Sequence, residues 1–198
     1  MNLVDRARNI IMSPKTEWAV VAEEAPSMNQ ILTGYVLPLA VLPAMAAVIG
    51  WGFVGGPFVG RHLGYGVATG AVQLVAAVAG VYISALVIDF LAPNFASCKS
   101  LGRAMQLVAY SMTPAWVGGV LNILPMIGWL GMLFGLYGLY LLYLGLPHLM
   151  KTPQDKVGIY VIASIVVILL VYIVLSAVLT TVALGALGIS GLARMGVF

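Results

Sequence analysis

The chain has 198 residues, of which 62% are hydrophobic and only 8% are charged, and its mean hydropathy is +1.08. A soluble domain carries roughly 25% charged residues, and a disordered chain is poor in hydrophobic residues, so both classes are excluded. The net charge is +3, but no basic stripe interleaved with aromatic residues is present, and a nucleic-acid partner is not expected. Composition therefore indicates an integral membrane protein.

Residues 1–30 are predicted to form a cytoplasmic amphipathic segment in front of the membrane domain. Apolar residues share one face of a short helix, and polar or charged residues share the other: Leu3, Val4, Ala7, Ile10 and Ile11 against Asp5, Arg6, Arg8 and Asn9. A second helix is expected from Pro14 to about Glu24, with Ser13 as its N-cap. The pair could lie on the anionic cytoplasmic leaflet, helped by Arg6, Arg8 and Lys15, or pack on the cytoplasmic end of the bundle, and the two placements are compatible.

The rest of the chain, residues 31–198, is predicted to be an all-α bundle of about five transmembrane helices. A span needs about 20 apolar residues, and the segments that qualify lie near residues 31–54, 65–92, 104–124, 126–147 and 158–187. A tight turn around Pro125 separates the third from the fourth. The first apolar run begins late and after several charges, so no signal peptide is expected.

The distribution of cations predicts the orientation of the bundle. With five spans and a cytoplasmic N-terminus, the inside segments hold most of the basic residues: Arg6, Arg8, Lys15, Lys99, Arg103, Lys151 and Lys156. The outside segments hold Arg61 and Arg194. The positive-inside rule then favours a cytoplasmic N-terminus and an external C-terminus, in a membrane expected to be the bacterial inner membrane.

Three prolines fall inside predicted spans and mark candidate hinges. Pro38 and Pro43 lie in the first span and Pro114 lies in the third. Each removes a backbone donor and tends to kink its helix, and the freed carbonyl must find another partner within the membrane. Either a fixed bend that fits the bundle or a hinge beside a solute site is consistent with them.

Glycines form a stripe on the fourth predicted span, which predicts close helix packing. The stripe consists of Gly128, Gly131, Gly135, Gly138 and Gly145. A similar stripe runs along the second span through Gly66, Gly70, Gln73, Ala77, Gly80 and Ser84. Small residues let helix backbones approach closely. The packing could lie within one copy of the chain or between copies, so self-association remains open.

Four stretches of the sequence are similar to a known family: Asn2–Trp18, Thr33–Ala44, Ala109–Val117 and Gly135–Lys156. They resemble the Yip-domain family, the Ypt/Rab-interacting membrane proteins, in its short bacterial branch. The resemblance implies five spans and a cytosolic N-terminus. Eukaryotic relatives are associated with Rab-type GTPases through a longer N-terminal region. Here that region is below the ~50 residues of a domain, so GTPase binding is not carried over.

Polar groups inside the spans are the candidate functional residues. Asp89 is the one ionisable residue within a predicted span, and its plausible partners are Lys99, Arg103 and Lys151. It is either a functional carboxylate or an interfacial one that reaches water. The neutral candidates are Gln106, Tyr110 and Thr113 on the third span, Gln73 on the second, and Tyr172, Ser176 and Thr180 on the fifth. They form either interhelical hydrogen bonds or a polar pathway.

The sequence contains no pattern typical of catalysis or of metal binding. The two histidines, His62 and His148, fall on opposite sides of the predicted bundle, and Cys98 is the lone cysteine. No nucleotide-binding, serine-hydrolase or zinc-protease motif occurs, so we expect neither enzymatic activity nor a cofactor. The leading hypothesis is a membrane scaffold or adaptor that contacts lipids and other membrane proteins. The alternative is a small transporter or channel, which requires a wet or closable cavity.

Overall fold

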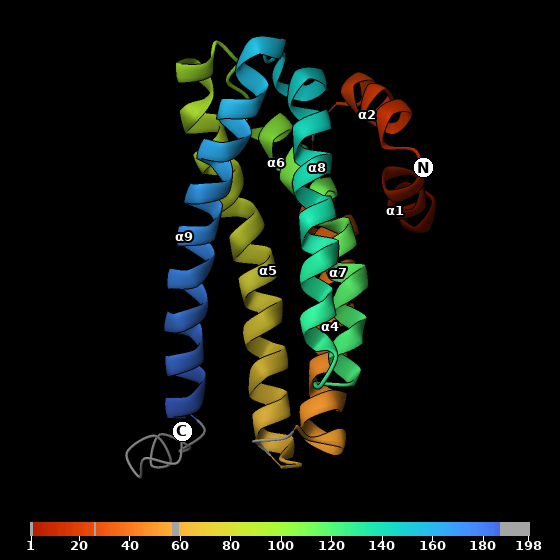
Figure 1. Ribbon diagram of the computed structural model, residues 1–198, viewed down its shortest axis with the longest axis vertical. Helices are drawn as coiled ribbons and strands as arrows, with labels where there is room; N and C mark the ends of the chain where they lie inside the picture. The colour runs from red at the N-terminus through yellow and green to blue at the C-terminus, as the bar shows by residue number, and fades with distance from the viewer. Residues whose placement is uncertain (1, 26, 57–59, 187–198) are drawn as a thin grey trace.

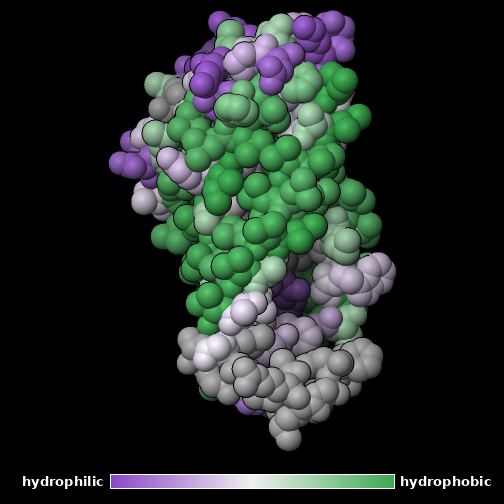
Figure 2. Space-filling view, turned by 90° about the vertical axis from the view of Figure 1, so that its left-hand side faces the viewer, coloured by the Kyte–Doolittle hydropathy of each residue, from purple (hydrophilic) through white to green (hydrophobic). Residues whose placement is uncertain are grey.

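The computed structural model describes residues 2–25, 27–56 and 60–186, and the regular structure of these residues is entirely helical. Four of the described helical stretches are long and apolar enough to cross a membrane: Met28–Val54, Leu63–Phe95, Gly128–Met150 and Gln154–Val182. They run along the long axis of the molecule (Figure 1). Apolar residues cover the middle of the face seen in Figure 2, and polar residues gather at its upper end. The predicted helical membrane bundle is confirmed.

The first spanning stretch is continuous but changes its helix type twice. It consists of α3 (Met28–Ile31), the π-helical η1 (Leu32–Val36), α4 (Leu37–Ile49) and the π-helical η2 (Gly50–Val54). Pro38 follows the first π turn, in which the Leu37 N–H donates to the Leu32 carbonyl five residues earlier. Because Pro38 has no N–H, a wider turn before it is a common accommodation. Pro43 is buried within α4.

The second spanning stretch is α5 (Leu63–Leu91), which continues as the 3-10 helix η3 (Ala92–Phe95). Its glycines allow α4 to approach closely. A Cβ atom built on Gly66 would lie 2.8 Å from the Val48 carbonyl oxygen, and one on Gly70 would lie 2.7 Å from that of Ala44. Further along the same stripe, a Cβ on Gly80 would meet no atom within 4 Å, so no neighbouring helix approaches closely at that position.

The predicted third span, residues 104–124, is not one continuous helix. The structure divides it into α6 (Leu101–Ser111), α7 (Thr113–Gly118) and the 3-10 helix η4 (Gly119–Ile123). The break at Met112 is caused by Pro114, which cannot donate to the carbonyl four residues earlier and instead starts a new helix. The broken segment still runs the length of the bundle, because α6 packs against α1 and α3 whereas η4 packs against η2.

The last two spanning helices complete the bundle. A turn that includes Pro125 leads into the 3-10 helix η5 (Gly128–Leu130) and then α8 (Gly131–Met150). The final helix, α9 (Gln154–Ala186), packs chiefly against α5. It ends at the opposite end of the bundle from its own first residue (Figure 1). Residue 187, the last of the predicted fifth span, lies outside the described residues.

The N-terminal helices α1 (Leu3–Met12) and α2 (Pro14–Glu23) pack on the side of the bundle near one end (Figure 1). Trp18 on α2 is fully buried, and the Tyr137 hydroxyl on α8 donates to the Ile11 carbonyl at 2.7 Å. Ser13 occupies the predicted N-cap position, although its side chain makes no capping hydrogen bond. Of the two placements left open by the sequence, the structure has the helices packed on the bundle.

Candidate functional site

A buried cation joins the N-terminal helices to one another. Arg6 on α1 is only 5% exposed, and its guanidinium pairs with Glu17 on α2 at 2.7 Å and with Glu24 just after α2. Arg6, predicted to help the N-terminal helices contact anionic lipid, is instead buried. The connection at Ser13 folds α2 back on α1 and brings both carboxylates to Arg6, and a charge is buried only where it is paired in this way.

Aromatic rings connect this ion pair to the bundle. The Arg6 guanidinium carbon lies 5.4 Å from the centre of the Tyr110 ring on α6, a cation–π geometry. The Tyr110 ring meets the Tyr35 ring of η1 edge to face at 4.7 Å between centroids, and it lies 6.3 Å from Trp18. The N-terminal helices, the first span and the broken third span therefore meet around Tyr110.

The helix break at Pro114 places Thr113 between Tyr110 and Tyr35. Pro114 leaves the carbonyl of Tyr110 without its usual helical donor, and the Thr113 hydroxyl donates to that carbonyl at 2.7 Å. The oxygen of Thr113 also lies 2.7 Å from the Tyr35 hydroxyl. Since Thr113 has one hydroxyl proton and gives it to Tyr110, Tyr35 is the donor to Thr113. A proline-freed carbonyl is thus satisfied within the protein, as the membrane interior demands.

Gln106 and Arg103 complete the polar region from α6. Arg103 donates to the Gln106 side-chain oxygen at 3.2 Å and to the Val21 carbonyl on α2 at 3.1 Å, and Gln106 is only 2% exposed. We refer to the whole set as the Arg6 cluster: Arg6, Glu17, Glu24, Tyr35, Arg103, Gln106, Tyr110 and Thr113. A mostly polar cavity of about 410 Å³ borders it, lined also by Asn2, Ser27 and Gln30.

A family comparison matches most of the chain that carries this cluster. The model described as the Yip1 domain matches residues 8–177. The chain belongs to the Yip1-domain family. The matched range includes every member of the Arg6 cluster except Arg6 itself, which precedes it by two residues.

Two curated relatives of this Yip1-domain chain are proteins named inner membrane protein YohC, from Escherichia coli strain K12 and from strain O6:H1. Each is 29% identical over 119 residues, which is 58% of this chain and 61% of the relative. The chain thus matches about three fifths of the length of these relatives. No solved structure matches it significantly.

The structure brings together some sequence-predicted residues and adds others. Gln106, Tyr110 and Thr113, predicted to share one face, all belong to the Arg6 cluster. Sequence reasoning missed Glu17 and Glu24. A signal was present, because residues seven apart lie on the same face of a helix, and that face of α2 also carries the buried Val21.

Asp89 lies apart from the Arg6 cluster and does not have the predicted cationic partners. In the part of the chain that the structure describes, Asp89 forms no ion pair, and its Oδ1 atom is buried without a hydrogen-bond partner. Lys99 and Lys151 are exposed instead, and Arg103 bonds to Gln106. Lys151 terminates α8 in a left-handed conformation with φ of 52°.

The glycine stripe of the Yip1-domain chain's fourth span packs closely at only some of its positions. A Cβ on Gly138 would lie 2.6 Å from the Ser111 carbonyl oxygen, and one on Gly145 would lie 2.5 Å from Leu107 and 2.9 Å from Trp18. A Cβ on Gly128 would lie 2.6 Å from the Asn122 side chain.

The remaining two positions of the stripe differ from the expectation. A Cβ on Gly131 would make only ordinary contact, and one on Gly135 would meet nothing within 4 Å. The packing prediction therefore fails at Gly135 within this chain. The third segment does contact α8 on either side of Gly135, at Phe134 and at Gly138, but no atom of it reaches the position of a Gly135 Cβ.

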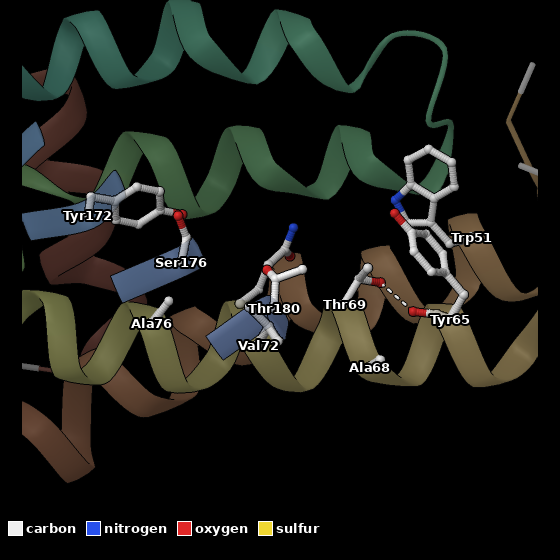
Figure 3. A pocket seen from close by; sticks show the side chains of 10 residues that line it. Trp51, Tyr65, Ala68, Thr69, Val72, Ala76, Tyr172, Ser176 and Thr180 are labelled. Atoms are coloured by element: carbon white, nitrogen blue, oxygen red, sulfur yellow. Dashed lines mark hydrogen bonds between the residues drawn. The ribbon is translucent and has the colours of Figure 1, made fainter. Parts of the chain in front are cut away.

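The second group of predicted neutral residues surrounds a separate cavity. Gln73 on α5 and Tyr172, Ser176 and Thr180 on α9 line a volume of about 220 Å³ together with Trp51 of η2 (Figure 3). Among the described residues, this cavity shares no lining residue with the one beside the Arg6 cluster. The predicted polar groups thus form two separate sites and not one pathway among the described residues.

Proposed function

We propose that this chain is a non-enzymatic adaptor of a bacterial inner membrane. One end of its bundle, formed by α1, α2 and the connections that contain Lys99 and Lys151, is a fixed platform for lipids and other membrane proteins. The observation that carries the proposal is the Arg6 cluster. The buried Arg6–Glu17 ion pair holds α1 to α2. Contacts of Arg6 and Trp18 with Tyr110, and hydrogen bonds from Arg103 and Tyr137, hold these helices against α6 and α8, so the N-terminal segment is part of a defined surface. The membrane location rests on the apolar helices and on the name of the relatives.

The exposed charges near this platform support contact with anionic surfaces. Arg8, Lys15, Lys99 and Lys151 are all exposed. Arg8 and Lys15 lie in the N-terminal helices, Lys99 lies in the connection between η3 and α6, and Lys151 lies in the connection between α8 and α9. Each basic residue near an anionic leaflet contributes about 1 kcal/mol of attraction. Anionic headgroups of the cytoplasmic leaflet are therefore one proposed partner, and acidic surfaces of other membrane proteins are another.

The same charges support a cytoplasmic N-terminus. Arg61 is the described basic residue at the opposite end of the bundle, and Arg194 lies outside the described residues. By the positive-inside rule the cation-rich end faces the cytoplasm, and α9 then carries the chain to the other side. A reporter that is active only in the cytoplasm should give no signal when fused after Phe198, and a strong signal would contradict this orientation.

Photo-crosslinking in native membranes tests the adaptor role. A photoreactive amino acid in place of Lys99 or Lys151 should give discrete protein adducts that mass spectrometry can identify. The control position is Phe53, which is 60% exposed near the opposite end of the first span. Adducts that form equally from Phe53, or no protein adducts from the platform, would contradict the proposal.

A second candidate function, transport of a small solute, is favoured by one specific observation. The cavity of about 410 Å³ beside the Arg6 cluster is lined mainly by polar residues, and a transporter requires a polar cavity. Asp89 does not line this cavity, so the buried and unpartnered Oδ1 atom of Asp89 would be a separate candidate site for a cation or proton. The purified protein in liposomes should show flux that Asp89→Asn slows. The adaptor proposal predicts no flux from the parent protein.

A further inference from the structure

The cavity between α5 and α9 lies in the half of the bundle away from the N-terminal helices. Its lining begins at Trp51 and Tyr65, near the ends of η2 and α5, and reaches Ala76. Tyr65 and Ala76 are separated by roughly 16 Å along α5 at 1.5 Å per residue. The cavity thus extends from the region of the membrane surface, where Trp and Tyr are typical, towards the middle of the bundle.

The lining offers hydrogen bonds but no charge. None of the described residues that line the cavity is an Asp, Glu, Lys, Arg or His. Thr69 and Ser176 already donate to backbone carbonyls of their own helices. The Gln73 Oε1 atom, in contrast, is buried without any hydrogen-bond partner, and a buried unpartnered polar atom is costly. A ligand that donates a hydrogen bond would satisfy Gln73 Oε1, and the uncharged lining favours a ligand without charge.

The apolar surroundings of the cavity would accommodate a hydrocarbon tail on the same ligand. Next to the lining residues, α9 exposes Ile173, Val174 and Val178, which are 61%, 62% and 54% accessible. In a membrane these side chains contact lipid tails. Tyr172, Ser176 and Thr180 lie along the α9 side of the cavity, and Ala68, Thr69 and Ala76 lie along the α5 side (Figure 3). An amphiphile can thus place its polar group inside and its tail along α9.

We propose that this cavity binds a neutral lipid that carries a free hydroxyl group, of the diacylglycerol or long-chain alcohol class. The ligand hydroxyl donates to Gln73 Oε1, and the Tyr172 hydroxyl, at the end of the lining away from Trp51 (Figure 3), offers a second hydrogen bond to an oxygen atom of the ligand. A phospholipid headgroup does not fit, because a phosphate is recognised by Arg, Lys or clustered N–H donors, and neither Arg nor Lys is among the described residues that line the site. This site is independent of the adaptor role.

Photolabelling of the full chain in phospholipid nanodiscs tests the proposal. A photoactivatable diacylglycerol should label residues 65–76 and 172–180 saturably. Excess unlabelled diacylglycerol should compete, whereas phosphatidylglycerol or free glycerol should not. Gln73→Leu should weaken apparent binding about five-fold, equivalent to ~1 kcal/mol for one hydrogen bond. Tyr172→Phe removes a hydroxyl at nearly constant shape and should also weaken it.

The matched control is Thr181→Val. Thr181 is exposed and adjacent to the lining residue Thr180, but its hydroxyl donates to the Ala177 carbonyl outside the cavity. Labelling of this variant should equal that of the parent. The proposal is overturned if no saturable labelling occurs, or if phospholipid or free glycerol competes equally well. It is also overturned if Gln73→Leu and Tyr172→Phe, with parental melting temperatures, both label like the parent.

Discussion

The charged residue Arg6 is buried, with an exposed fraction of 5%. Its ion-pair partner Glu17 is equally buried. Removing one partner of a buried ion pair leaves the other charge uncompensated, which costs about 3–5 kcal/mol. Glu24 is partly exposed, so water would relieve part of the cost on that side. Loss of the Arg6 side chain alone should therefore destabilise the protein more than loss of the exposed Arg8 side chain on the same helix.

Substituting Arg6 tests this contribution at the residue scale. Arg6→Gln should lower the free energy of unfolding by about 3 kcal/mol, the lower end of the range for breaking a buried pair. Thermal unfolding of the purified protein in detergent measures the change. Arg8→Gln is the control, because Arg8 is exposed on the same helix, and it should change stability by less than about 0.5 kcal/mol. Equal effects of the two variants would show that the Arg6 pair is not a buried contact.

At the residue scale, only part of the Arg6 cluster could be predicted from the sequence. The face shared by Gln106, Tyr110 and Thr113 could be read from helical spacing, because these residues are close in the chain. The Arg6 pairs could not, because they depend on how α2 folds back on α1. A helical wheel assigns Arg6 to a polar face but cannot say whether that face meets water or two carboxylates.

At the scale of elements, prolines set the shape of the spans. Pro114 splits the third segment, which hydropathy alone presents as one helix, and Pro38 follows a π turn in the first. Pro43, in contrast, sits within regular α4. The positions of possible breaks were therefore predictable from sequence, but which proline breaks its helix depends on the partners available to the freed carbonyl, such as Thr113.

Two glycines of α8 provide a matched test of element packing. Gly138→Ala should destabilise the protein by about 1–3 kcal/mol, because its Cβ would lie 2.6 Å from the Ser111 carbonyl oxygen. Gly135→Ala should be neutral or stabilising by up to about 1 kcal/mol, since alanine is the better helix former and the site is open. Melting curves of both variants in one detergent check the difference. The same loss at both positions would mean that Gly135 contacts another copy of the chain.

At the scale of the whole molecule, hydropathy and charge predicted the class, a helical membrane bundle. Four of the predicted spans overlap helices long enough to cross a membrane, whereas the predicted third span is divided at Pro114. Span length and hydropathy follow from the lipid environment, because a segment that crosses the hydrocarbon core must be a long apolar helix. The packing of α1 and α2 was left open, since an amphipathic helix buries its apolar face equally well in a membrane surface or against other helices. The structure resolves this choice through contacts with α6 and α8.

Hydrogen exchange of residues 3–23 tests most directly the claim that the N-terminal helices are part of the bundle. In nanodiscs made only of neutral phospholipid, the amides of α1 and α2 should be protected, and added anionic lipid should change that protection little. Arg6→Gln should reduce it selectively, leaving α5 unchanged. Rapid exchange in neutral nanodiscs, with protection appearing only on anionic lipid, would contradict the account and show that the helices lie on the membrane surface instead.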